Sequence, residues 1–139
     1  MPALDQCEPQ ILRALYKQGW HILDKPLAIR VEQGQRYLFA DVRLSNIHTQ
    51  DEIIIVEIKC FSHPRTLMDD LYSAIGQYTI YQQGLMLNSV FSKLFLAMPH
   101  DIYLLLRQDK LIASTLNHVK INIITVNFER EEVELWITY

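Results

Sequence analysis

Hydrophobic residues recur along the chain at helical and at extended spacings, and their order predicts a mixed α/β fold. Apolar positions at helical spacing predict a first helix over residues 5–18, which Gly19 would end, and a long helix over residues 66–83. Two apolar runs, at residues 53–59 and 94–98, predict two central strands, because strands covered on both faces are apolar almost throughout. The first of these runs is charged only near its end.

Shorter segments complete this pattern. Residues 27–31 alternate as a strand does, residues 32–35 favour a hairpin turn, and residues 36–44 predict the second strand of that hairpin. The other predicted elements are a short apolar run at 20–23, helical pieces over 100–118, and two final strands at 120–126 and 133–139 joined at 127–130. The 139 residues contain no linker or repeat, so we expect one α/β (α+β) domain, residues 1–139, with helices flanking a mixed central sheet.

The composition indicates the kind of compartment in which the protein is expected. Half of the residues are hydrophobic and 21% are charged, which is the balance of a soluble globular protein. No signal peptide is expected at residues 1–5, and the uncharged run over residues 71–92 contains too many amides for a membrane span. The two cysteines, Cys7 and Cys60, lack the spacing of a disulfide framework or a zinc site, so both are expected to be reduced in a cytoplasmic protein, with Cys60 as a small packed side chain.

The formal net charge of −3 argues against a broad DNA-binding surface, because phosphate contacts require Lys and Arg. Basic residues nevertheless gather in the first half of the chain: Arg30, Arg36, Arg43, Lys59 and Arg65. Acidic residues gather near its end: Glu129, Glu131, Glu132 and Glu134. Any DNA-binding surface is therefore expected to be local, with a partner supplying further positive charge.

The candidate catalytic residues lie where a predicted buried strand ends in charged residues. Side chains alternate between faces along a strand, so Glu57 and Lys59 point the same way and Ile58 points to the opposite face. Asp41 interrupts the apolar run of the preceding strand, where an acid must be paired, bound to a metal or solvated in a cleft. Asp41, Glu57 and Lys59 together match a PD-(D/E)xK nuclease-type site. The structural alternative is a Glu57–Lys59 ion pair at a strand end, with Asp41 capping a loop.

This pattern predicts one divalent metal ion, magnesium or manganese. Magnesium prefers oxygen ligands and keeps several waters, so the carboxylates of Asp41 and Glu57 with the backbone carbonyl of Ile58 would suffice. The metal would stabilise charge on a phosphate and acidify a water, and Lys59 would orient or activate that water. Asp41, Glu57 and Lys59 are thus the predicted catalytic residues of a magnesium-dependent endodeoxyribonuclease.

Three further residues are candidates for accessory roles. Gln77 and Tyr81 stand four residues apart on the predicted long helix, so they share one of its faces, and Gln-x-x-x-Tyr recurs in one branch of the PD-(D/E)xK proteins. Glu8, on the first helix, would add a carboxylate to the metal site. Each has a structural alternative: Tyr81 as a core residue, Gln77 as a partly buried amide, and Glu8 as the partner of Asp5 in a capping box.

Taken together, these segments resemble the family of fdxN-element excision controlling factors, the XisH family. In the N-terminal half the resemblance rests on Met1-Pro2-Ala3, Ala14-Leu15, Gly19-Trp20 and Lys25-Pro26-Leu27. In the centre it rests on Phe39-Ala40-Asp41, Val56-Glu57-Ile58-Lys59 and Ala74-Ile75-Gly76-Gln77-Tyr78 with Tyr81. Ala97-Met98-Pro99 and Glu134-Leu135-Trp136-Ile137 extend it over essentially the whole chain. Glu8 and Cys60 depart from the pattern, since many relatives have His and Ser at these positions.

The resemblance implies a restriction-endonuclease-like fold, with Asp41, Glu57 and Lys59 as its core motif and Gln77 and Tyr81 on its accessory helix. It also implies a role in cyanobacterial developmental DNA rearrangement, as in heterocysts, where such proteins assist a site-specific recombinase beside a companion factor, XisI. Two functions remain open at this point. One is a metal-dependent nuclease that cuts or nicks DNA, and the other is a non-catalytic factor that binds DNA or a partner. A homo-oligomer is compatible with both.

Overall fold

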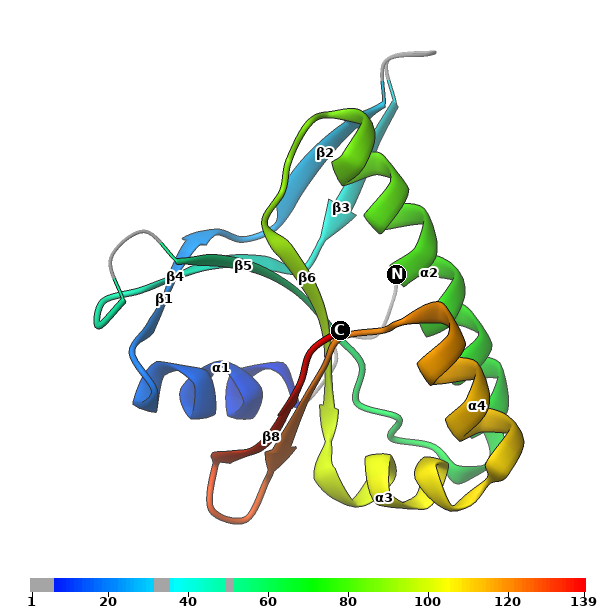
Figure 1. The fold of residues 1–139 in the computed structure, drawn as a ribbon. Coiled ribbons are helices and arrows are strands. Elements are labelled where there is room, and N and C mark those ends of the chain that lie inside the picture. Colours follow the sequence, from blue (N-terminus) through cyan, green and yellow to red (C-terminus); the bar gives the residue numbers. More distant parts are fainter. Residues whose placement is uncertain (1–6, 32–35, 50–51) are drawn as a thin grey trace.

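The computed structural model describes residues 7–31, 36–49 and 52–139. These residues form four α-helices, one 3₁₀ turn and eight strands in the mixed α+β arrangement of Figure 1. The helices are α1 (Glu8–Lys17), α2 (Leu67–Leu87), α3 (His100–Gln108) and α4 (Lys110–Val119), and the 3₁₀ turn η1 (Pro64–Thr66) precedes α2. The strands are β1 (Trp20–Asp24), β2 (Leu27–Val31), β3 (Arg36–Ala40), β4 (Val42–Asn46), β5 (Ile53–Ile58), β6 (Lys93–Pro99), β7 (Ile123–Asn127) and β8 (Glu132–Ile137).

Six of these strands form one mixed sheet in the order β1-β4-β5-β6-β7-β8. The neighbours β5, β6 and β7 run parallel, whereas the pairs β1–β4, β4–β5 and β7–β8 are antiparallel. Strands β5 and β6 are buried almost from end to end, because helices lie on both sides of the sheet (Figure 1). The prediction of two central strands from their apolar runs is therefore confirmed.

Different helices cover the two faces of this sheet. On one face lies α1, whose Ile11 packs in the same cluster as Val56 of β5 (Figure 1). On the other face lie α2, α3 and α4, and Leu71 of α2 packs in the same cluster as Ile55 of β5. Successive residues of β5 thus contribute to separate cores, as the alternation of a strand requires.

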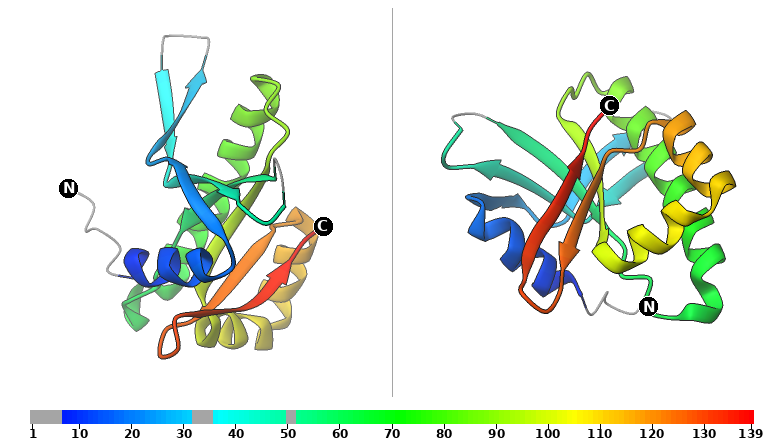
Figure 2. Two further views of the ribbon diagram at one scale, coloured as in Figure 1. Left: turned by 90° about the vertical axis from the view of Figure 1, so that its left-hand side faces the viewer. Right: turned by 60° about the horizontal axis from the view of Figure 1, so that its bottom comes forward.

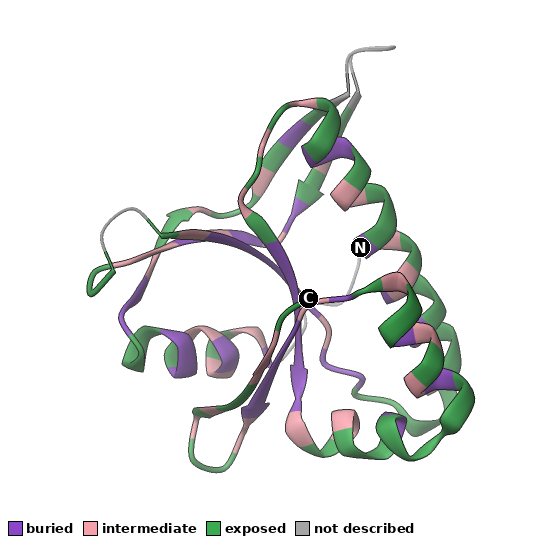
Figure 3. Ribbon diagram, in the orientation of Figure 1, coloured by how far each residue is buried: buried purple, intermediate pink, exposed green. Residues whose placement is uncertain are grey.

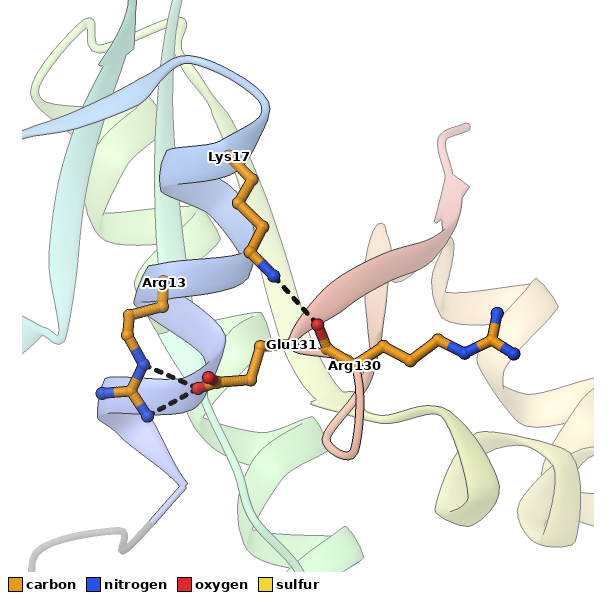
Figure 4. A network of polar contacts seen from close by, with 4 residues as sticks. All are labelled: Arg13, Lys17, Arg130 and Glu131. Carbon is orange, nitrogen blue, oxygen red and sulfur yellow. Dashed lines mark hydrogen bonds and ion pairs between the residues drawn. The ribbon is translucent and has the colours of Figure 1, made fainter.

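Polar contacts hold α1 against the turn between β7 and β8 (Figure 4). Arg13 forms an ion pair with Glu131, and the Nζ of Lys17 donates a hydrogen bond of 2.9 Å to the backbone carbonyl of Arg130. These contacts join residues more than a hundred positions apart in sequence, so they orient α1 relative to the edge of the sheet. They are exposed, and each ion pair of this kind contributes less than about 1 kcal/mol.

Strands β2 and β3 form a separate antiparallel hairpin, which extends beyond the six-stranded sheet beside the C-terminal part of α2 (Figures 1 and 2). The turn predicted at residues 32–35 lies outside the described residues. The single strand predicted over residues 36–44 is wrong, because the chain breaks at Asp41 into β3 of the hairpin and β4 of the sheet. Strands β3 and β4 both have the alternating side-chain pattern of an extended chain. This pattern does not show that the two strands pair with different partners.

The remaining predicted elements are present with shifted ends. The described part of the first helix begins at Glu8, and Gly19 follows it with a φ of 93°, a left-handed value that favours glycine. The long helix α2 continues to Leu87 rather than ending at residue 83. The predicted helical pieces after residue 100 are α3 and α4, and the two final strands are β7 and β8. No described helix is both long enough and apolar enough to cross a membrane.

Candidate active site

Asp41 occupies the corner where the hairpin strand β3 gives way to the sheet strand β4. Its side chain is half-buried, and its Oδ2 accepts a hydrogen bond of 2.7 Å from the backbone N–H of Ile58. This contact satisfies a backbone donor at the end of β5, and such a donor is costly to bury without an acceptor. It also fixes the position of the carboxylate against β5.

Glu57 and Lys59 stand at the carboxyl end of β5. Ile55 of the same strand packs into the core beneath α2, and the alternation of side chains directs Glu57 and Lys59 toward that same face. The side chain of Glu57 is buried, with the residue only 4% exposed, whereas Lys59 is half-buried. The backbone N–H of Lys59 donates a hydrogen bond of 3.0 Å to the carbonyl of Ala97 on β6, which holds the end of the strand in place.

The two acids come from neighbouring segments of the sheet. Val42 pairs with Val56 in the antiparallel ladder between β4 and β5. Asp41 precedes Val42 and Glu57 follows Val56, so the two acids lie next to the same end of this ladder. The hydrogen bond from the N–H of Ile58 to Asp41 holds the carboxylate of Asp41 beside the residue that follows Glu57. Two carboxylates placed in this way can serve one ion.

Tyr81 of α2 lies within electrostatic range of both acids. Burial raises its pKa above the ordinary value of 10.0, and the negative charges of Glu57 and Asp41 raise it further. Both carboxylates act on one hydroxyl, so these three groups gather in one region on the α2 side of the sheet. Gln77 lies one helical turn before Tyr81 on the same face of α2, and its Oε1 is buried with no hydrogen-bond partner among the described residues.

The ionisation of Tyr81 tests this arrangement without any assay of activity. We expect its phenolate to form only above pH 10, and we expect Glu57→Gln to lower the pKa of Tyr81 toward 10.0, because the substitution removes one negative charge. The measurement is an ultraviolet titration of tyrosinate, with Tyr81→Phe identifying the signal of this residue. Such a control is necessary because burial also raises the pKa of Tyr78.

The raised pKa of Tyr81 also predicts how the stability of the folded protein depends on pH. The folded-state pKa of Tyr81 lies above its unfolded value, so the unfolded chain loses this proton first as the pH rises. The corresponding stability is fully present below pH 10 and is lost as the pH rises from there through the folded-state pKa. A titration of Glu57→Gln that matched the parent would contradict the placement of Tyr81 beside Glu57.

Asp41 and Glu57 supply the carboxylate oxygens that a magnesium ion prefers. Within residues 7–31, 36–49 and 52–139, no group of three or more His, Cys, Asp and Glu side chains is placed to hold a metal. A metal at this site would therefore depend on these two acids, on a backbone oxygen such as the carbonyl of Ile58, and on water. Magnesium is commonly bound by one or two carboxylates and keeps several waters, whereas zinc takes three or four protein ligands. The two acids thus fit magnesium or manganese.

Glu8 forms an ion pair with a residue outside this set. It begins α1, which covers the sheet face opposite to α2, and its Oε1 lies 3.4 Å from the Nζ of Lys25. A negative charge in the first turn of a helix is also favourable by itself. The structure therefore pairs Glu8 with Lys25, and its accessory role at the metal site stays a prediction.

A disulfide between Cys7 and Cys60 joins the start of α1 to the residue that follows Lys59. The two Cα atoms are 5.7 Å apart, within the usual range for a disulfide, although 53 positions separate the residues in sequence. Cys60 is buried, as predicted, but the prediction of two reduced cysteines is wrong. Sequence spacing carries no information about this pair, because the fold of the intervening segment brings the residues together.

The fold of this chain is shared with known proteins. A family model described as XisH protein matches residues 1–134. The chain belongs to the XisH family. The crystal structure of an XisH family protein from Nostoc punctiforme PCC 73102 matches with a TM-score of 0.83 at 25% identity, covering 94% of this chain and 97% of that one. The crystal structure of an fdxN element excision controlling factor protein from Anabaena variabilis matches with a TM-score of 0.86 at 26% identity, covering 97% and 100%. No curated protein matches the sequence.

These XisH-family matches confirm the resemblance inferred from the sequence blocks, and they confirm the mixed α+β fold. The match extends over nearly the full length of both solved chains. The corner at Asp41, the end of β5 and the long helix α2 therefore all lie within a framework common to the family.

Proposed function

We propose that this XisH-family chain is a DNA-rearrangement factor whose residues Asp41, Glu57 and Lys59 form a metal-dependent endonuclease site. The observation that supports this most is the meeting of two acids at the end of β5, where both raise the pKa of Tyr81. Lys59 follows directly after β5, and its two-residue spacing from Glu57 favours the same face. This set is the PD-(D/E)xK pattern of restriction-endonuclease-like folds. The Anabaena relative is named for excision of a DNA element, which favours DNA as the substrate.

Each residue has a distinct part in this proposal. Asp41 and Glu57, with the carbonyl of Ile58, would hold magnesium or manganese, which when bound supplies positive charge to the phosphate and acidifies a water. Lys59 would orient the attacking water and stabilise the negative charge that develops on the phosphate. Gln77 is half-buried and offers an acceptor, Oε1, that could position the same water. The burial of Glu57 favours strong electrostatic interactions, because the local dielectric constant is lower than that of water.

A second candidate function is a non-catalytic factor that binds DNA or a partner protein during excision. The formal net charge of −3 and the small number of acidic ligands favour this alternative. XisI and a site-specific recombinase, which the family resemblance implies as partners, belong to both proposals. A basic partner would supply the phosphate contacts that this acidic chain lacks.

Lys59→Ala tests the proposed chemistry. The substitution leaves Asp41 and Glu57 in place, so we expect metal binding to persist while cleavage falls about 10²–10³-fold, through loss of the charge that stabilises the developing oxyanion. The measurements are the nicking of supercoiled plasmid with Mg²⁺ or Mn²⁺, its suppression by a chelator, and calorimetric titration of the metal. Lys93→Ala, which removes an exposed lysine at the start of β6, is the matched control and should cleave like the parent.

Two outcomes would separate the candidates. If the parent nicks DNA, Lys59→Ala loses this activity and Lys93→Ala keeps it, the nuclease proposal is supported. If the parent leaves plasmid intact with either metal, even beside its companion proteins, and nevertheless binds DNA, the non-catalytic alternative replaces it.

A further inference from the structure

The β2–β3 hairpin has one face turned toward the protein and one turned toward solvent. Ile29 and Leu38 pair across the hairpin and point inward, where both approach Gly84 of α2. Side chains of an antiparallel pair alternate together, so the neighbouring pairs in the register point outward. Figure 3 shows the resulting alternation of buried and exposed residues along this hairpin.

The outward face carries two aromatic rings and a positive charge. It consists of two cross-strand pairs, Ala28 with Phe39 and Arg30 with Tyr37, and all four residues are exposed. Tyr37 is 53% exposed and Phe39 is 55% exposed. Their rings are stacked, with centroids 6.4 Å apart and planes inclined by 28°. Large aromatic side chains gathered on a solvent-exposed face mark a binding surface more often than single exposed residues do.

The charge of this region differs from that of the whole chain. The hairpin strands, residues 27–31 and 36–40, contain two arginines and no acid, although the chain has a formal net charge of −3. The part of α2 beside the hairpin adds no charge, since residues 71–92 contain no Asp, Glu, Lys or Arg, and Asp69 and Asp70 lie in the first turn of this helix. No carboxylate of the two hairpin strands or of residues 71–92 therefore repels an anion at this face.

The outward face also lies close in sequence to the candidate active site. Phe39 lies two residues before Asp41, at the end of β3 where the chain turns into the sheet. The backbone carbonyl of Arg30 accepts a hydrogen bond of 2.6 Å from the Nδ2 of Asn88, just after α2, which holds the free end of β2 in place. A strand lying along the hairpin would thus be led from Tyr37 past Phe39 toward Asp41.

We propose that the face formed by Ala28, Arg30, Tyr37 and Phe39 binds an unpaired stretch of DNA, with bases stacked on Tyr37 and Phe39 and a phosphate held by Arg30. Aromatic side chains stack on bases whose faces are exposed, and a base within an intact duplex has no exposed face. Stacked bases repeat about every 3.4 Å, so rings 6.4 Å apart correspond to about two steps of a base stack. The inference rests on the proposed function, because it takes DNA as the substrate.

A second copy of this chain is a less favourable occupant. In a two-fold symmetric contact the same face meets itself, which would bring Arg30 of each copy toward the other. A negatively charged strand instead satisfies both features of the face, the aromatic rings and the arginine.

The test measures DNA binding in the presence of a chelator, so that cleavage plays no part. Fluorescence anisotropy with a labelled oligothymidylate should show binding by the parent. Tyr37→Ala and Phe39→Ala should each weaken it at least about 5-fold, and the double substitution about 30-fold. Tyr37→Trp should preserve binding, because a tryptophan ring also stacks. Tyr72→Ala is the matched control: this exposed tyrosine lies twelve residues before Gly84 on α2, about 18 Å along the helix. It should bind like the parent.

Each other result has a defined meaning. If the parent binds and nicks duplex DNA while the hairpin variants keep full affinity for oligothymidylate, this inference is overturned and the proposed function stands. If the parent binds neither single strands nor duplex, both fail. If the double variant dissociates a dimer in sedimentation velocity without changing DNA affinity, the face is a contact between copies of the chain.

Discussion

Glu57→Ala is expected to abolish both metal binding and DNA cleavage, the largest functional loss that we predict for a single substitution in this chain. Glu57 is buried at the end of β5, and Asp41 accepts the N–H of the next residue, Ile58. Among the described residues, these two acids are the ones available to an ion there. Removing Glu57 takes away one of the two charged ligands, and the remaining carboxylate would have to hold the ion without a second negative charge. Calorimetric titration with Mg²⁺ or Mn²⁺ and plasmid nicking measure the two losses, and Glu132→Ala, an exposed acid on β8, is the matched control.

Asp41 requires a pair of substitutions, because its carboxylate also accepts the N–H of Ile58. Asp41→Ala leaves this donor without its acceptor and should lower the free energy of unfolding by about 1–3 kcal/mol as well as abolishing metal binding. Asp41→Asn keeps an oxygen acceptor and removes the charge, so it should lose metal binding at nearly parental stability. If both acid variants, Asp41→Asn and Glu57→Ala, bind metal like the parent, the metal site is not formed by these residues.

Reduction of the Cys7–Cys60 disulfide is expected to lower the free energy of unfolding by about 2–4 kcal/mol. The bond closes a loop across 53 positions of sequence, and a long loop loses much conformational freedom when it is cross-linked in the unfolded chain. The disulfide also lines a cavity of about 380 Å³ between α1 and the start of α3, which gives a small dithiol a route to it. Urea unfolding of the oxidised protein, with and without dithiothreitol, measures the difference.

The double variant Cys7→Ser/Cys60→Ser is the control for this measurement. It should unfold at the lower urea concentration of the reduced parent and should not respond to dithiothreitol. An oxidised parent whose unfolding midpoint is unchanged by the reductant would show that the bond adds no stability to the folded chain.

The candidate site is assembled from three parts of the fold, each with its own support. The corner between β3 and β4 positions Asp41, the end of β5 positions Glu57 and Lys59, and α2 positions Tyr81. Backbone contacts fix the first two parts, since Ile58 donates to Asp41 and Lys59 donates to Ala97. The disulfide ties the residue after Lys59 to α1 on the opposite face. A substitution on either face of the sheet can therefore alter the position of the residues at the end of β5.

Features that depend on neighbours within a few residues could be predicted from the amino-acid order. Glu57 and Lys59 share a face because a strand has a period of two, and Gln77 and Tyr81 share one because four residues span about one helical turn. The centre of the sheet was predictable from the apolar runs of β5 and β6, because burial on both faces leaves little room for polar alternation.

Features that depend on the choice of a distant neighbour appeared only in the folded chain. The break at Asp41 separates two strands with the same alternating pattern, and the hydrogen bond that holds this corner joins residues 17 positions apart. The packing of α1 places Glu8 beside Lys25 and brings Cys7 to Cys60. A repeating pattern of side chains indicates which face of a helix or strand is apolar, but many other helices and strands could cover that face. The choice among them is made by pairing and packing across the whole core, which no local window of residues contains.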